Sequence, residues 1–144
     1  MKKSILFVVL LLTLMQLIGI DKTNPDVDLT TELKVPEDIG HLLEKSCYDC
    51  HSNKTVWPGY ADIAPVSFFV ASHVEDGRKA LNFSNWDNIP KDIKIARLKR
   101  SIITVKNGMM PLSSYLWMHK EAKLTSNEQS KLAAWFQAQL KKYE

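Results

Sequence analysis

Cys47-Tyr48-Asp49-Cys50-His51 holds both cysteines of this chain and one of its four histidines. Two thiols at this spacing can each add to one of the two vinyl groups of a haem, while the next histidine brings its imidazole under the iron. Covalent attachment holds such a cofactor without a large enclosing pocket. The motif therefore predicts one covalently bound haem c, with thioethers at Cys47 and Cys50 and with His51 as an iron ligand.

Three other uses of a Cys-x-x-Cys pair remain open. A dithiol redox motif usually lies near a βαβ pattern, and no strand alternation flanks this site. A structural disulfide suits an exported chain, but this spacing closes a very small loop that adds little stability. A zinc site needs further ligands at matching spacing, and His41, His73 and His119 are scattered. We prefer the haem interpretation.

The segment from Asn107 to Pro111, Asn-Gly-Met-Met-Pro, offers a second iron ligand. It follows a predicted helix over Asp92 to Lys106, which Gly108 would end. Proline prevents the helix from resuming, so the segment forms a loop that can aim a thioether at a metal. Methionine ligation raises the reduction potential relative to a bis-histidine haem and favours a six-coordinate electron carrier. We expect Met110 to be this sixth ligand.

Other residues compete for the sixth position. Met109 is adjacent to Met110, and flexible core filling is the commonest role of either methionine. His73 lies on the apolar face of a predicted helix over residues 65–77 and is expected to point inward, where a histidine is more often a hydrogen-bonded core residue than a ligand. His119 is a weaker candidate.

Residues 1–20 form a segment of their own, in which Lys2 and Lys3 precede an apolar run over residues 4–20. The run lacks an Ala-x-Ala-like cleavage site, so we expect an uncleaved membrane anchor, with a cleaved signal peptide as the alternative. The run is at the short end of the roughly 17–25 residues that cross a bilayer. The lysines keep the N-terminus in the cytoplasm. In either case the rest of the chain is exported.

The charge balance argues against nucleic acid as a partner. The chain has 19 Lys+Arg against 16 Asp+Glu, and Lys2 and Lys3 supply two of the three surplus positive charges. Phosphate binding needs a concentrated excess of cations, which the exported part lacks. Residues 21–35 are polar and aperiodic and predict a linker. Residues 36–144 then form one haem-binding domain, small enough that a cofactor would complete its core.

Helical periodicity dominates this domain. A helix beginning at Pro36 carries its apolar face directly to Cys47. Thr125 and Glu128 form a capping box at the start of a final helix. We predict an all-α, cytochrome-c-like domain with four to five helices around one haem, preceded by an N-terminal hydrophobic helix. Three tryptophans are expected in the core or in the walls of the haem pocket, namely Trp57, Trp86 and Trp117.

Further motifs follow in order along the chain. They are Ser52-Asn53, Trp57-Pro58-x-Tyr60-x-x-Ile63-x-Pro65, Gly77-Arg78, Leu81-Asn82-Phe83-Ser84-x-Trp86, Met110-Pro111-Leu-x-x-Tyr115, His119-x-x-Ala122-x-Leu124 and Trp135. With the cysteine motif they resemble the bacterial haem-binding-domain family of small exported c-type cytochrome-like proteins, over residues 36–140. The resemblance implies haem attachment through Cys47 and Cys50 with His51 as axial ligand, and it supports Met110. Gly59 departs from the aromatic residue expected between Pro58 and Tyr60.

These observations together predict a monohaem electron carrier, not an enzyme, tethered by residues 4–20 to the periplasmic side of the bacterial cytoplasmic membrane. Its partners would be redox proteins. The alternatives are a peroxidase-like haem enzyme or a gas or redox sensor with a displaceable sixth ligand, and a non-catalytic haem subunit of an exported complex. Basic residues around the helix over Asp92 to Lys106 predict a solvated face. The alternative is that part of this cluster pairs with haem propionates or steers an acidic redox partner, and Arg78 is a second propionate candidate. The basic residues are Lys91, Lys94, Arg97, Lys99, Arg100 and Lys106.

Overall fold

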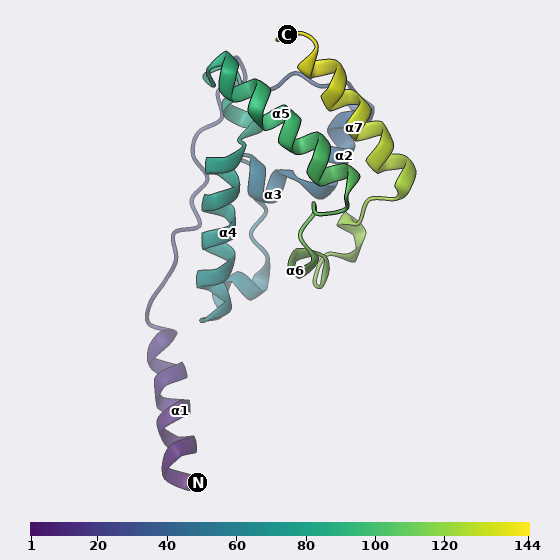
Figure 1. Cartoon of the computed structure of the whole chain (residues 1–144). Coiled ribbons are helices and arrows are strands. Elements are labelled where there is room, and N and C mark those ends of the chain that lie inside the picture. The colour runs from purple at the N-terminus through teal and green to yellow at the C-terminus, as the bar shows by residue number, and fades with distance from the viewer.

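The computed structural model describes residues 1–144 and is helical throughout, without a β-strand (Figure 1). Its helices are α1 (Lys2–Met15), α2 (Glu37–Ser46), α3 (Tyr48–His51), α4 (Val66–Ala80), α5 (Lys91–Lys106), α6 (Ser113–Leu116) and α7 (Ser126–Leu140). Three 3₁₀ turns connect them, η1 (Gly59–Asp62), η2 (Phe83–Asn85) and η3 (Lys120–Ala122). The all-α prediction is confirmed. Four helices form the body of the domain, α2, α4, α5 and α7, while α3 and α6 are single turns.

The hydrophobic core lies where α2, α5 and α7 meet. Their apolar positions recur three and four residues apart, so each helix buries one stripe. The largest contributors are Leu43, Leu98, Ile102, Leu132 and Phe136, together with Phe83 and Trp86 from the segment between α4 and α5. Two ion pairs join α2 to α7, Lys45 to Glu128 at 2.6 Å and Asp38 to Lys131 at 2.6 Å. The C-terminal end of α2, and with it Cys47, is therefore anchored to the core.

Local signals account for the helix ends. The capping box of α7 is present, with the Thr125 amide donating to Glu128 Oε2 at 2.7 Å and the Glu128 amide donating to Thr125 Oγ1 at 3.3 Å. Gly108 lies just after α5 with a φ of +63°, a conformation that favours glycine. The chain therefore leaves α5 abruptly and turns toward α6.

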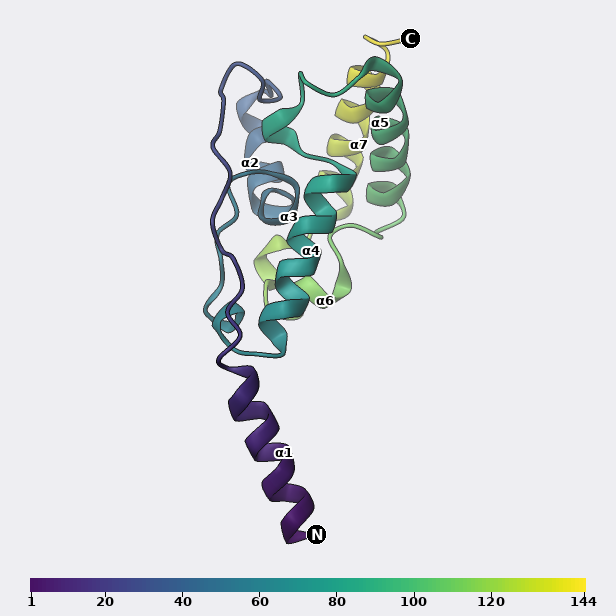
Figure 2. The same cartoon turned by 90° about the vertical axis from the view of Figure 1, so that its left-hand side faces the viewer.

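The segment over residues 21–35 has no helix or strand, and it runs the length of the domain (Figure 2). The Leu33 amide donates to Phe83 O at 2.9 Å, and the Asp87 amide donates to Thr31 O at 2.9 Å. The Leu33 side chain is buried in the core. The core thus includes residues that precede Pro36, the predicted start of the domain, because backbone hydrogen bonds to the α4–α5 connection hold this part of the chain in place.

Helix α1 is exposed along its length and points away from the rest of the molecule (Figures 1 and 2). None of the helices has both the length and the apolar character needed to cross a membrane.

The structure places Trp86 in the core, as expected, whereas Trp117 is 85% exposed and lies outside the core. One prediction about a surface position is wrong. Lys94 is buried rather than part of a solvated face, with its Nζ 5.6 Å from the centre of the Trp86 ring. Its aliphatic stem covers apolar surface and its ammonium group lies over aromatic rings. Lys94 therefore does not belong to the solvent-exposed basic residues of α5.

Candidate functional site

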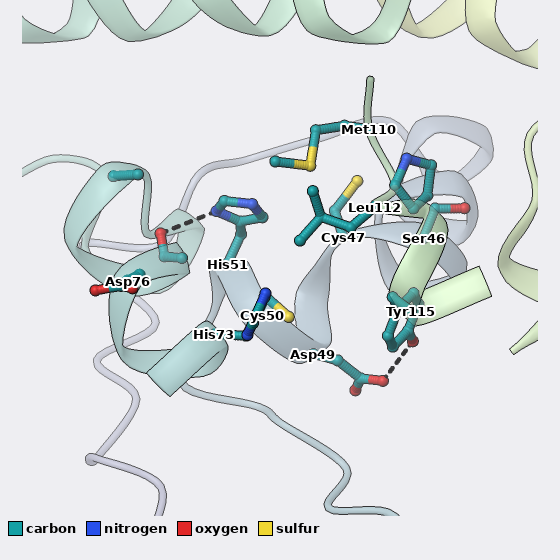
Figure 3. Close-up of a pocket in the computed structure, with 13 residues that line it drawn as sticks. Ser46, Cys47, Asp49, Cys50, His51, His73, Asp76, Met110, Leu112 and Tyr115 are labelled. Atoms are coloured by element: carbon teal, nitrogen blue, oxygen red, sulfur yellow. Dashed lines mark hydrogen bonds between the residues drawn. The ribbon is translucent and has the colours of Figure 1, made fainter. Parts of the chain in front are cut away.

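The turn α3 brings the three side chains of the cysteine motif to one cavity (Figure 3). Cys47 stands between α2 and α3 with φ −133° and ψ −36°, so the helix direction changes at this residue. The His51 amide donates to Cys47 O at 2.9 Å, which closes the turn. Because residues three and four positions apart share one side of a helical turn, Cys47, Cys50 and His51 all face the same space.

The His51 ring is held in one orientation and one tautomer. Its Nδ1 lies 3.0 Å from Gly77 O and 3.0 Å from Leu81 O. Carbonyl oxygens only accept hydrogen bonds, so Nδ1 carries the proton and Nε2 keeps a free lone pair. Burial lowers the pKa of His51 by disfavouring the charged ring, although both carbonyls oppose this effect. The result is a neutral imidazole prepared to bind a metal through Nε2.

Gly77 allows α4 to supply one of these carbonyls. A Cβ built on Gly77 would overlap the Cys50 carbonyl oxygen and would lie 2.9 Å from Cys50 Cβ. Only glycine therefore permits this approach of α4 to α3. From the sequence, Gly77 was part of the Gly77-Arg78 motif but was not a predicted site residue. A glycine inside an amphipathic helix pattern was the available signal of a close backbone approach.

The two cysteines are free thiols with little thiolate character. Burial raises the pKa of Cys47 to about 12 and that of Cys50 to about 11. Reactive dithiols have lowered pKa values, so these thiols do not resemble a dithiol redox centre. No cluster of three or more His, Cys, Asp or Glu side chains is placed to hold a metal ion, so a protein-ligated zinc site lacks donors.

Three adjoining cavities meet at the cysteine motif. The first, of about 220 Å³, is lined by all three motif side chains and by Met110. The second, of about 440 Å³, shares Cys47, His51 and Met110 with it. The third, of about 520 Å³, shares Cys50 and His73. A flat macrocycle joined to both cysteines would lie in the first two cavities, which share Cys47, His51 and Met110, and the free Nε2 of His51 provides a donor suited to its iron. The residues therefore fit a haem.

The structure separates the two adjacent methionines. Met110 is half-buried and lines the first two cavities, and its sulfur is drawn near His51 in Figure 3. Met109 is 58% exposed and lines none of the three. Both amides donate to Thr104 O, at 2.8 Å for Met109 and 3.3 Å for Met110. The turn at Gly108 thus directs only Met110 toward the motif.

His73 also borders the site, but its helix face differs from the prediction. Its ring is half-buried, lies 4.1 Å from the Phe69 ring and lines the first and third cavities. Its Nδ1 is 2.8 Å from Phe69 O, which leaves Nε2 free. Val66 and Phe69 are exposed, and on the predicted apolar face only Val74 is buried. This face borders the third cavity and not the packed core, and residues of α6 line the same cavity.

His119 belongs to a hydrogen-bonded group beside the third cavity. Its Nε2 lies 2.7 Å from Tyr60 Oη and its Nδ1 lies 3.2 Å from a Glu121 carboxylate oxygen, so both ring nitrogens are engaged. Its ring stacks on Tyr115 with centroids 4.3 Å apart. The Tyr115 hydroxyl donates to Asp49 Oδ2 at 2.7 Å and thereby ties the α6 region to the cysteine motif. Burial and the Asp49 carboxylate both raise the pKa of Tyr115.

Arginines close the second cavity on the α5 side. Arg97 and Arg100 line it together with His51 and Met110. Arg78, the other propionate candidate, instead donates to Ser52 O at 2.9 Å and to side chains of the neighbouring loop segments. It lines none of the three cavities. The cationic groups suited to an anionic cofactor edge are therefore on α5.

Comparison with known protein families gives one match, described as a haem-binding domain, over residues 10–138. No curated protein and no solved structure matches the chain. The matched range contains the cysteine motif, the Met110 loop and every residue that lines the three cavities.

Proposed function

Because the chain belongs to the haem-binding-domain family, we propose that it carries one covalently bound haem c and acts as a membrane-tethered electron carrier. The observation that supports this most directly is the arrangement at His51. Its tautomer is set by two carbonyls, both cysteines lie beside it, and Met110 faces the same cavity. An imidazole and a thioether are the ligand pair of high-potential electron-transfer haems.

The chain's own residues would hold the haem as follows. Cys47 and Cys50 would hold the haem through thioethers, for which each Sγ–H adds across one vinyl group without a leaving group. His51 would ligate through Nε2 while its Nδ1–H stays bonded to Gly77 O and Leu81 O. Met110 would supply its sulfur as the other iron ligand. The haem itself supplies an iron that cycles between the ferrous and ferric states.

Electron transfer by such a site would leave the protein largely unchanged. The anchored α2, the closed turn α3 and the contact at Gly77 hold the ligands in place in both oxidation states, which keeps reorganisation small. Arg97 and Arg100 would pair with the propionates. The exposed cations of α5 would steer acidic redox proteins toward this edge. No nucleic acid is expected as a partner.

The N-terminal segment would determine the location. Lys2 and Lys3 followed by apolar residues favour export with the N-terminus retained in the cytoplasm, so we place the domain on the periplasmic side of the bacterial cytoplasmic membrane. Residues 4–20 would remain as the tether.

His73 favours a second candidate, a haem enzyme or gas sensor with a displaceable sixth ligand. Its free Nε2 borders the same cavity as Met110, where a polar group could stabilise a bound exogenous ligand.

Visible spectroscopy separates the two candidates. The full chain is produced with a c-type haem maturation system as wild type, Met110→Ala, Met109→Ala and His73→Ala. The carrier predicts low-spin, six-coordinate haem in every protein except Met110→Ala, which becomes high-spin. A high-spin wild type that readily binds carbon monoxide would favour the enzyme or sensor. Release of the haem by acid–acetone would contradict covalent attachment, which both candidate functions assume.

A further inference from the structure

The end of the domain nearest α1 carries an exposed apolar surface. Six side chains form it, and we call them the apolar end: Val56, Ile63, Val66, Phe69, Trp117 and Met118. Trp117 is 85% exposed and Met118 is 64% exposed. All except Ile63 line the third cavity. Exposed apolar surface on this scale usually marks an interaction site.

Gln16 fastens α1 to this same end. Its Nε2 donates to Ala64 O at 2.9 Å, and its Oε1 accepts from the Ala64 amide at 3.0 Å. Ala64 lies between Ile63 and Val66, two members of the apolar end. Two hydrogen bonds in opposite directions restrain both the separation and the rotation of α1 relative to η1 and α4. Both views show α1 leaving the domain at this end, with the C-terminus at the opposite end (Figures 1 and 2).

The charge distribution indicates what the apolar end contacts. The third cavity is lined by no lysine or arginine, and Asp49 is its only acidic residue. Exposed lysines and arginines lie on α5 and on several other elements, among them Lys120, which is close in sequence to Met118. Because Asp49 is the one charged side chain that lines the third cavity, this surface offers little to a charged redox protein. A bilayer surface instead accepts uncharged apolar side chains, and an indole is especially suited to the headgroup region.

We propose that the apolar end lies in the surface of the lipid bilayer that receives α1, with Trp117 and Met118 at the level of the headgroups. This inference rests on the membrane tether of the proposed function. Helix α1 and the domain then bind the membrane as one unit, and Gln16 sets the angle between them. The domain is held close to the bilayer with the cationic side of α5 turned toward water, available to soluble partners.

Two methionines provide a matched test. Met118 and Met109 have similar exposure, 64% and 58%, but only Met118 belongs to the apolar end. The full-length, haem-loaded chain is bound to vesicles of phosphatidylethanolamine and phosphatidylglycerol, and hydroxyl-radical footprinting measures oxidation of both residues. We expect similar oxidation rates without vesicles. With vesicles, Met118 should be oxidised about fivefold more slowly relative to Met109, because interfacial burial excludes the radical.

The variant Gln16→Ala tests the orienting role of the two hydrogen bonds. It should still float with vesicles, since α1 keeps its apolar residues, but Met118 should regain most of its oxidation rate. Trp117 oxidation serves as a second readout.

Each other outcome identifies what fails. Flotation with unchanged Met118 oxidation overturns the lipid contact and leaves the tether intact. Absence of flotation overturns both the lipid contact and the tether, while the haem spectrum still reports on the electron carrier separately. Slow oxidation of Met118 in the absence of vesicles overturns the proposal. If this protection increases with protein concentration, the apolar end binds a second copy of the chain. If the protection is independent of concentration, the bound haem covers this surface.

Discussion

His51 shows how much of this site depends on the backbone of another helix. Its Nδ1 proton is fixed by Gly77 O and Leu81 O, both at 3.0 Å, and this leaves Nε2 as the only nitrogen able to bind iron. Such outer hydrogen bonds commonly orient a metal-bound histidine and set its basicity. Gly77 contributes twice, because its carbonyl bonds the ring and its missing side chain lets Cys50 come close.

Gly77→Ala should therefore impair haem binding more than a glycine-to-alanine change usually does. The added methyl overlaps the Cys50 backbone, and relieving the overlap by moving α4 costs about 1–3 kcal/mol and displaces the carbonyl from His51. We expect a reduced yield of haem-loaded protein and a shifted Soret band. Gly59→Ala is the control, because nothing lies within 4 Å of a Cβ at that position. Equal haem yields in the two variants would contradict the role of Gly77.

At the scale of single elements, each helix is stabilised by a local device that also serves the site. The α7 capping box shares its Glu128 with Lys45 of α2, so the start of α7 and the end of α2 depend on one carboxylate. Helix α5 ends at Lys106, and the turn at Gly108 just after it directs Met110 to the cavity, while arginines of α5 line the second cavity.

Glu128 should make stability sensitive to acid. The hydrogen bond from Lys45 lowers the pKa of Glu128 to about 2, and the Thr125 amide adds to the effect. A lowered folded-state pKa stabilises the protein above the unfolded value of 4.5, and this contribution is lost as the pH falls toward about 2. Glu128→Gln should lose this pH-dependent contribution, measured as a smaller fall in the midpoint of thermal unfolding between pH 5 and pH 2. Thr125→Ala should instead lower the free energy of unfolding by about 1 kcal/mol at neutral pH, because the helix loses its N-cap. A Glu128→Gln protein with the acid sensitivity of wild type would disprove the assignment.

The arginines of α5 should govern the approach of anions. In the double variant Arg97→Gln/Arg100→Gln, electron exchange with an anionic reductant such as hexacyanoferrate should fall about three- to tenfold at low ionic strength. Its rate should also depend less steeply on salt than that of wild type. Lys34→Gln removes an exposed charge from outside α5 and serves as the control. If wild type, the double variant and Lys34→Gln showed identical salt dependence, the α5 charges would not attract anions and would serve only to keep the protein soluble.

At the scale of the whole molecule, the core occupies one side of the domain and the cavities occupy the other. Helices α2, α5 and α7 pack together through buried aliphatic and aromatic side chains. The first and third cavities lie instead among α3, α4 and α6, and α5 closes the second, with half-buried residues between them. A bound haem would fill space that this small domain does not fill with its own side chains.

Production without haem attachment should therefore weaken one side of the molecule selectively. We expect the apo chain to unfold about 10 °C or more below the holo chain, because its cavities lose their packing partner. Hydrogen exchange should increase mainly in residues 48–80 and 107–119, while α5 and α7 keep most of their protection. Uniform loss of protection across the domain would show instead that haem supports the whole core.

Several features follow from the sequence because they depend on neighbours within a turn or two. The Cys-x-x-Cys-His spacing, the start of α2 at Pro36, the Thr125–Glu128 box and the helix over α5 all involve residues no more than four positions apart, or repeat with helical period. The apolar pattern also predicted α4 as a helix, but it did not reveal that His73 and Phe69 face a cavity. Periodicity identifies a face without identifying what that face meets.

The sequence by itself therefore indicated a haem cofactor, the helical class and the candidate ligand loop, since the spacing of a motif and helix propensity are local properties of the chain. Tertiary structure alone decided which histidine has a free nitrogen at the cavity, which of two methionines faces it, and which glycine lets α4 reach His51. It also directed the Arg78 side chain of α4 to the neighbouring loop segments, and it placed Trp117 at the surface and Leu33 in the core. These outcomes depend on contacts between segments far apart in the chain, and such contacts form only when whole helices pack.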